Sequence, residues 1–187
     1  MKKYTLLILV LFIGSFAFAQ ENDSSKKLTR KEKKEIEKKE NNEKLKVLYS
    51  LLENKIWIIE ANEVKATNGN TVTVNQEMNF VTMNLERGVV QLALQELMGI
   101  GANNIGGVTV EGEVTKYDLK EFEDNKQISC IMQVDNKNGG FARLSINVMA
   151  NGRTTVRVTG GYGVDFTFSG YLKPQGETHI IKGSSAR

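Results

Sequence analysis

Two glutamates in the middle of the chain are the strongest candidates for chemistry. Glu111 and Glu113 stand two residues apart in a segment that alternates apolar and polar residues. Alternate residues of a strand face the same side, with Cα atoms about 7 Å apart. Two carboxylates so placed could hold calcium or act across a glycosidic bond. The same pattern fits a solvated sheet face, whose buried side would carry Val108, Val110, Gly112 and Val114.

A glycine- and asparagine-rich stretch before this segment is a second candidate for ligand binding. It contains Gly99, Gly101, Asn103, Asn104, Gly106 and Gly107. It lacks the Gly-Lys-Ser/Thr ending of a phosphate loop, and it precedes a strand rather than a helix. Asn104 also stands where the dinucleotide fingerprint requires its third glycine. We expect a long loop with positive φ angles, of the kind that can carry a binding site on a rigid sheet.

Metal and nucleophile chemistry have few residues to draw on. The chain has one histidine, His179, and one cysteine, Cys130, and no zinc-type ligand spacing. A single cysteine permits no internal disulfide, and its apolar neighbours predict a small buried side chain. We expect His179 in an exposed C-terminal tail, which disfavours a Cys–His pair or a catalytic triad. The sequence therefore predicts no metal and no cofactor.

The N-terminus has the three regions of a cleavable signal peptide. Lys2 and Lys3 precede an apolar run, and Ala17-Phe18-Ala19 gives the small-x-small pattern before a cleavage site between Ala19 and Gln20. The run is about 15 residues long, short of the ~20 needed to cross a bilayer, and no later stretch is long and apolar enough. We expect an exported protein, periplasmic or secreted, with no transmembrane segment in the mature chain.

Charge divides the mature chain into two parts. Residues 21–46 hold ten Lys or Arg against seven Asp or Glu, whereas residues 47–187 hold thirteen against fifteen. A nucleic-acid-binding face would need clustered basic residues on the folded domain, so we expect no nucleic-acid partner. The predicted organisation is a signal peptide (1–19), a charged leader or helical spacer (20–44), one β-rich domain (45–183) and a short tail (184–187).

Hydrophobic spacing predicts one short helix followed by many strands. Leu45, Leu48 and Leu52 recur at helical spacing, with Val47 and Leu51 widening the face, so we expect an amphipathic helix at about residues 43–55. Strand-like runs follow at intervals of roughly 8–14 residues, separated by Gly- and Asn-containing turns. This pattern predicts a mainly β fold, an antiparallel meander that forms a barrel or a sandwich.

Two strand segments resemble a known family. The signature Gly106-Gly-Val-Thr-Val-Glu-Gly-Glu-Val-Thr-Lys-Tyr117 and the ending Asp165-Phe-Thr-Phe-Ser-Gly-Tyr-Leu172 are similar to those of an uncharacterised exported bacterial family, domain-of-unknown-function family 4251. The resemblance covers about residues 50–183. It implies a β-rich exported domain and no assigned activity.

These observations favour a non-catalytic binding or envelope-associated module. Its partner would be a small molecule, a glycan or an envelope protein. Two alternatives stay open. One is a glycan-acting hydrolase that uses Glu111 and Glu113, and the other is an inhibitor of a secreted enzyme. A barrel interior filled with side chains would favour recognition on the outer surface over binding inside the barrel.

Overall fold

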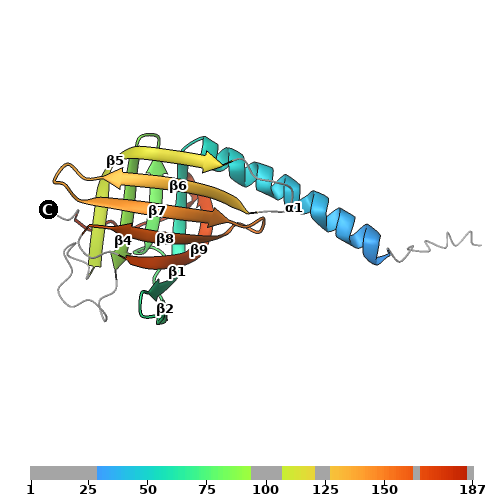
Figure 1. Cartoon of the computed structure of the whole chain (residues 1–187), viewed down its shortest axis with the longest axis horizontal. Helices are drawn as coiled ribbons and strands as arrows, with labels where there is room; N and C mark the ends of the chain where they lie inside the picture. The colour runs from blue at the N-terminus through green and yellow to red at the C-terminus, as the bar shows by residue number, and fades with distance from the viewer. Residues whose placement is uncertain (1–28, 94–106, 121–126, 162–164, 185–187) are drawn as a thin grey trace, which may run out of the picture. The chain divides into compact units, whose positions relative to one another are not determined.

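A computed structural model describes residues 29–93, 107–120, 127–161 and 165–184. One helix precedes a mainly β domain (Figure 1). The elements are α1 (Arg30–Glu53), β1 (Ile56–Ala66), β2 (Thr71–Thr73), β3 (Phe80–Asn84), β4 (Arg87–Ala93), β5 (Gly107–Lys120), β6 (Ile128–Asp135), β7 (Phe141–Val148), β8 (Arg153–Gly160), β9 (Asp165–Pro174) and the short 3₁₀ helix η1 (Gln175–Glu177).

The strands form an antiparallel meander that closes on itself. β3 to β9 follow one another in sheet order, and β1 pairs with β3 on one side and with β9 on the other. Eight strands thus make a barrel, and β2 is a short addition beside the second half of β1. The fold class is as predicted, and the choice between barrel and sandwich is settled in favour of the barrel.

β5 is the strand that turns the corner of the barrel. Its first half pairs with β4 and its second half with β6, with a register shift between Val114 and Lys116. In Figure 1, β3 and β4 lie behind β6 to β9 and run across their direction. Gly112 permits the bend, because a Cβ atom there would lie 1.8 Å from the backbone oxygen of Asp135. A side chain at this position would force the two strands apart.

Alternating apolar residues fill the barrel interior. The strands β6 to β9 bury every second residue, a period of two that turns one face inward. Trp57 and Phe168 are fully buried, and Cys130 is buried among the core residues as predicted. On β5, Val110 and Gly112 are buried and Val108 and Val114 are half-buried, which confirms the predicted inner face.

The helix is longer than the apolar spacing predicted. It begins at Arg30, within the charged leader, and continues to Glu53. Thr29 and Glu32 form a capping box: the Thr29 amide donates to the Glu32 carboxylate at 2.7 Å, and the Glu32 amide donates to the Thr29 hydroxyl at 3.3 Å. These hydrogen bonds lower the pKa of Glu32. An N-cap of this kind and good helix formers extend the helix without any apolar stripe.

The C-terminal half of α1 packs against the barrel through its leucines. Leu45 and Leu52 are buried in the same core as the strands, and Leu48 and Leu51 are partly buried against it. Val47 is 71% exposed, so its predicted place on the packed face was wrong. It lies on another side of the helix, because residues five apart, such as Val47 and Leu52, are separated by about 140° at 3.6 residues per turn.

A hydrogen bond and a cation fix the join between helix and barrel. The hydroxyl of Tyr117 in β5 donates to the backbone oxygen of Leu52 at 2.8 Å. The ammonium of Lys55, whose backbone adopts a left-handed φ of 57° just after the helix, lies 5.4 Å from the centre of the Tyr117 ring. Burial raises the pKa of both Tyr117 and its neighbour Cys130, the latter to about 12. Among the described residues, no helix has both the length and the apolar character to span a bilayer.

Candidate functional site

A groove on the outer surface, at the bend of β5, brings the two candidate glutamates together with residues from two other segments. It has a volume of about 890 Å³. Its walls come from the β3–β4 turn, the middle of β5 and the β6–β7 hairpin. They consist of Glu86, Arg87, Glu111, Gly112, Glu113, Thr115, Asp135, Asn136, Lys137 and Asn138.

Strand register explains why these residues meet. Arg87 of β4 and Asp135 of β6 are both cross-strand partners of Glu113, on its two sides. The three side chains therefore cross the groove in one row on the outward face. The backbone amide of Val114 also donates to the backbone oxygen of Glu86 at 2.7 Å, which fixes the β3–β4 turn beside β5.

Glu111 and Glu113 share the outward face of β5, as predicted, but their surroundings differ. The Glu111 carboxylate accepts two hydrogen bonds of 3.0 Å from the Lys182 ammonium and lies 3.6 Å from the Arg87 guanidinium. Its side chain is 24% exposed. Glu113 is exposed to solvent. Their use as the acid pair of a glycan hydrolase stays a prediction.

Asp135 is held in place at the opposite wall of the groove. One oxygen of its carboxylate accepts a hydrogen bond from the Thr115 hydroxyl at 2.6 Å, and the other accepts one from the Gln133 amide at 2.9 Å. Among the residues the structure describes, no three His, Cys, Asp or Glu side chains come together as a metal site. Two carboxylates of the groove, those of Glu111 and Asp135, are thus fixed by hydrogen bonds, and its lining also contains amide side chains and the cations of Arg87 and Lys137.

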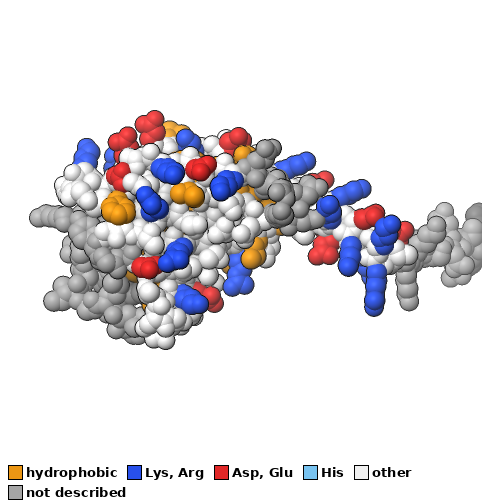
Figure 2. All heavy atoms as spheres, viewed as in Figure 1, with side chains coloured by type: hydrophobic (Ala, Val, Ile, Leu, Met, Phe, Trp, Pro, Cys, Tyr) orange, Lys and Arg blue, Asp and Glu red, His pale blue; other side chains and the backbone are white. Residues whose placement is uncertain are grey.

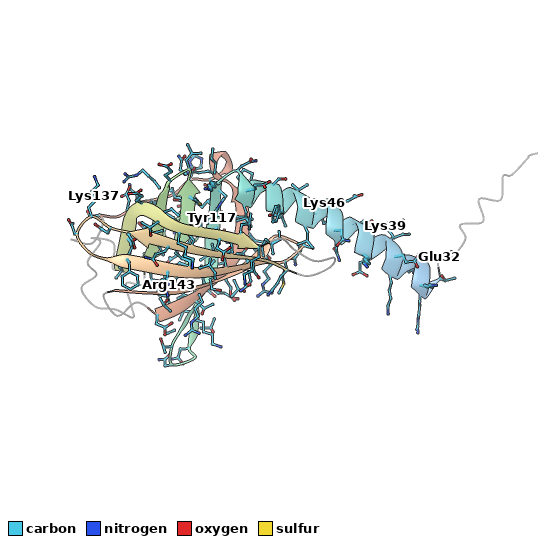
Figure 3. All side chains as sticks on the ribbon, turned by 45° about the horizontal axis from the view of Figure 1, so that its top comes forward. Glu32, Lys39, Lys46, Tyr117, Lys137 and Arg143 are labelled. Carbon is cyan, nitrogen blue, oxygen red and sulfur yellow. The ribbon has the colours of Figure 1, made fainter. Side chains whose placement is uncertain are left out.

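The β6–β7 hairpin separates this groove from a smaller recess of about 240 Å³. The hairpin is shaped by Asn136, whose amide donates to the backbone oxygen of Gly140 at 2.7 Å and whose side-chain oxygen accepts from the amide of Asn138 at 2.9 Å. Figure 3 shows Lys137 at the tip of this hairpin and Arg143 on the neighbouring strand β7. Phe141, which is 41% exposed, lines the smaller recess with Arg143.

Most of the glycine-rich loop lies outside the described residues, including Gly99, Gly101, Asn103, Asn104 and Gly106; so does the expected cleavage site at Ala19 and Gln20. Gly107 is the first residue of β5 and is buried. A Cβ atom there would lie 1.8 Å from the backbone oxygen of Leu92. The absence of a side chain at Gly107 therefore permits the close approach of β4 and β5.

The C-terminal segment was misjudged as a free tail. His179 is exposed as expected, yet the residues after it are anchored. The amide of Ile181 donates to the backbone oxygen of Glu77 at 2.8 Å, and Lys182 reaches Glu111. The amide of Gly183 donates to the side-chain oxygen of Gln91 at 2.8 Å. Neither Gln91 nor Lys182 carried a sequence signal, because their contacts join positions about 70 to 90 residues apart.

Comparison with known proteins identifies the family of the chain. The family model for the domain of unknown function DUF4251 matches residues 38–172. The crystal structure of a DUF4251 family protein from Bacteroides eggerthii is similar, with 29% sequence identity and a TM-score of 0.60; the match covers 72% of this chain and 92% of that one. A search of curated proteins found no match. The chain belongs to the DUF4251 family, as its two strand signatures indicated.

Proposed function

We propose that the protein is an exported, non-catalytic module that recognises a polar component of the cell envelope on the outside of its barrel. The observation that carries this proposal is the contrast between the interior and the groove. Apolar side chains with 0–7% exposure fill the barrel, whereas the groove of about 890 Å³ on its surface is lined by charged and amide side chains. A ligand would therefore bind outside.

The lining of the groove favours a hydroxyl-rich ligand such as a glycan. Carboxylates accept hydrogen bonds from hydroxyl groups, and asparagine side chains both donate and accept them. The groove offers Glu113 and Asn138 in addition to the anchored Asp135. Phe141, beyond the hairpin, could add an apolar contact for a sugar ring that extends past Asn136. The side chains coloured in Figure 2 show dispersed charges of both signs and separate hydrophobic spots.

A pair of matched variants tests the groove. Glu113→Gln removes a carboxylate inside it, whereas Asp118→Asn removes an exposed carboxylate farther along the same strand. We expect the wild-type protein and Asp118→Asn to co-sediment with purified peptidoglycan sacculi and with envelope polysaccharide, and Glu113→Gln to bind at least fivefold more weakly to the glycan that is recognised. Equal retention of both variants, or no retention of the wild type on any envelope glycan, would contradict the proposal.

Export is tested separately. Expression of the full chain in a bacterium should yield a mature protein in the periplasm or the medium that begins at Gln20. Replacement of Ala17 and Ala19 by larger residues should leave the precursor uncleaved, because signal peptidase requires small residues there. A wild-type protein that keeps residues 1–19 and stays in the cytoplasm would refute this part of the proposal.

A further inference from the structure

Residues 178–184, here called the strap, cross the outer face of β3, β4 and β5. The strap follows η1 and is extended at Thr178, with φ −133° and ψ 146°. Its contacts then proceed across the sheet: the amide of Ile181 bonds to Glu77 just before β3, Gly183 bonds to Gln91 in β4, and Lys182 pairs with Glu111 in β5.

Gln91 recognises the main chain of the strap with both ends of its side-chain amide. Its nitrogen donates to the backbone oxygen of Ile181 at 2.7 Å, and its oxygen accepts from the amide of Gly183 at 2.8 Å. The same nitrogen also donates to the backbone oxygen of Met78 at 2.9 Å, and the same oxygen also accepts from the hydroxyl of Thr109 at 3.1 Å. The side chain of Gln91 is fully buried with every donor and acceptor engaged. This geometry recognises an extended backbone whatever side chains it carries.

The apolar side chains of the strap itself remain partly exposed. Ile180 and Ile181 are 36% and 50% exposed. The outer face of β3, β4 and β5 beneath the strap places Phe80, Gln91 and Thr109 side by side in register, and all three are fully buried. Gln91 and Thr109 can bond to water when uncovered, whereas Phe80 is apolar, so a segment that replaces the strap must keep Phe80 covered. Main-chain hydrogen bonds and one ion pair thus hold the strap, and another extended segment that also covers Phe80 can replace them.

We propose that this face is a binding site for an extended peptide segment carrying a lysine or arginine, and that residues 181–183 are its resident occupant. Gln91 and Glu77 would bond to the backbone of a partner segment, and Glu111 would pair with its basic side chain. A partner protein binds by displacing the strap. The proposal goes beyond glycan recognition in the groove and does not depend on it, although displacement of Lys182 would also free Glu111 at the groove wall.

The test uses the full chain with an undocked strap. A double variant, Ile181→Pro with Gly183→Pro, removes both strap amides that donate to the barrel, since proline has no N–H. The probe is a fluorescent peptide with the sequence of residues 178–184, followed by anisotropy. We expect the double variant to bind this peptide at least tenfold more tightly than the wild type, whose own strap competes.

Two further changes identify the groups that recognise the peptide. Gln91→Ala in the double variant should weaken peptide binding at least tenfold, and a peptide with glutamate in place of its lysine should bind at least tenfold more weakly. A folded double variant, with the Trp57 fluorescence of the wild type, that fails to bind the peptide would overturn the proposal. Binding that is indifferent to both changes would overturn it as well.

Hydrogen exchange on the wild-type protein supplies a test that needs no variant. The amides of Ile181 and Gly183 should exchange at least a hundredfold faster than those of Val156 and Val158 in β8, because displacement requires local opening of the strap without unfolding of the barrel. Exchange as slow as in β8 would show that the strap opens only when the whole domain unfolds, and it would refute displacement.

Discussion

The inner and outer faces of the barrel use the same strands for different purposes. In β9, Phe168 points inward and is fully buried, whereas Tyr171 points outward and is 44% exposed. In β4, Val90 and Leu92 fill the interior, whereas Gln91 between them binds a segment from the C-terminus. The inner face provides stability through contacts that any apolar residue of suitable size can make. The outer face provides specific polar contacts that depend on particular side chains.

The largest expected effect comes from a change inside the barrel. Phe168→Ala should lower the free energy of unfolding by about 3–5 kcal/mol, because it removes a fully buried ring and leaves a cavity. Tyr171→Ala, in the same strand but on the outer face, should cost about 0.5 kcal/mol or less. Urea unfolding followed by the fluorescence of Trp57, the single tryptophan, measures both. Similar losses for the two variants would contradict the distinction between the faces.

The second-largest expected effect is a fall in the free energy of unfolding at alkaline pH, caused by two groups in the interior. Burial raises the pKa of Cys130 from 9.0 to about 12 and also raises that of Tyr117. Both groups stay protonated in the folded state while the unfolded chain loses its protons, so stability is complete below about pH 9 and falls as the pH rises. Each group can contribute a slope of up to about 1.4 kcal/mol per pH unit.

The variant Cys130→Ala shows how much of the loss of stability at alkaline pH comes from the Cys130 thiol. Its loss of stability between pH 9 and pH 12 should be shallower than that of the wild type, whatever its stability at pH 7. Unfolding titrations at a series of pH values provide the comparison. Parallel curves for the two proteins would show that the buried thiol does not govern this range.

The smallest expected effect is a difference in stability between changes at two glutamines of the outer face. Gln91→Ala should cost about 1–3 kcal/mol, because it leaves the hydroxyl of Thr109 and the backbone groups of the strap without their partner. Gln133→Ala, which changes a half-buried glutamine on the outer face of β6, should cost less than about 1 kcal/mol. Protease cleavage near residue 181 should accelerate only in Gln91→Ala. Equal cleavage in both variants would show that Gln91 does not anchor the strap.

Residue alternation predicted the inner face well and the outer face poorly. The inward positions of β5 to β9 repeat every second residue, so their burial could be read locally, and Leu45 and Leu52 marked the packed side of α1. Closure of the barrel could not be read in this way, because it depends on pairing Ile59 with Leu172 across the length of the domain. A helix within the charged leader was one of two predicted alternatives for residues 20–44, and the structure confirms it from Arg30 onward, after the Thr29 cap, although no burial pattern marks this start.

In the candidate site too, local spacing was predictable and contacts between distant segments were not. The shared face of Glu111 and Glu113 follows from the spacing of a strand, and this much was predictable. The groove itself depends on the β6–β7 hairpin folding beside the bend of β5, and the burial of Gln91 depends on a cover from residues about 90 positions away. In the sequence, Gln91 looks like an ordinary solvent-facing residue, since alternation carries no information about what lies over a sheet.

The pairing of β1 with β9 has a consequence for how the chain acquires its structure. β1 is among the first strands of the domain to be synthesised and β9 is the last. Until Asp165–Pro174 is available, one side of β1 and one side of β8 present unpaired backbone groups. The incomplete barrel is therefore an open sheet whose two unpaired edges can pair with other chains. These edges disappear only when the ten residues of β9 pair with both β1 and β8.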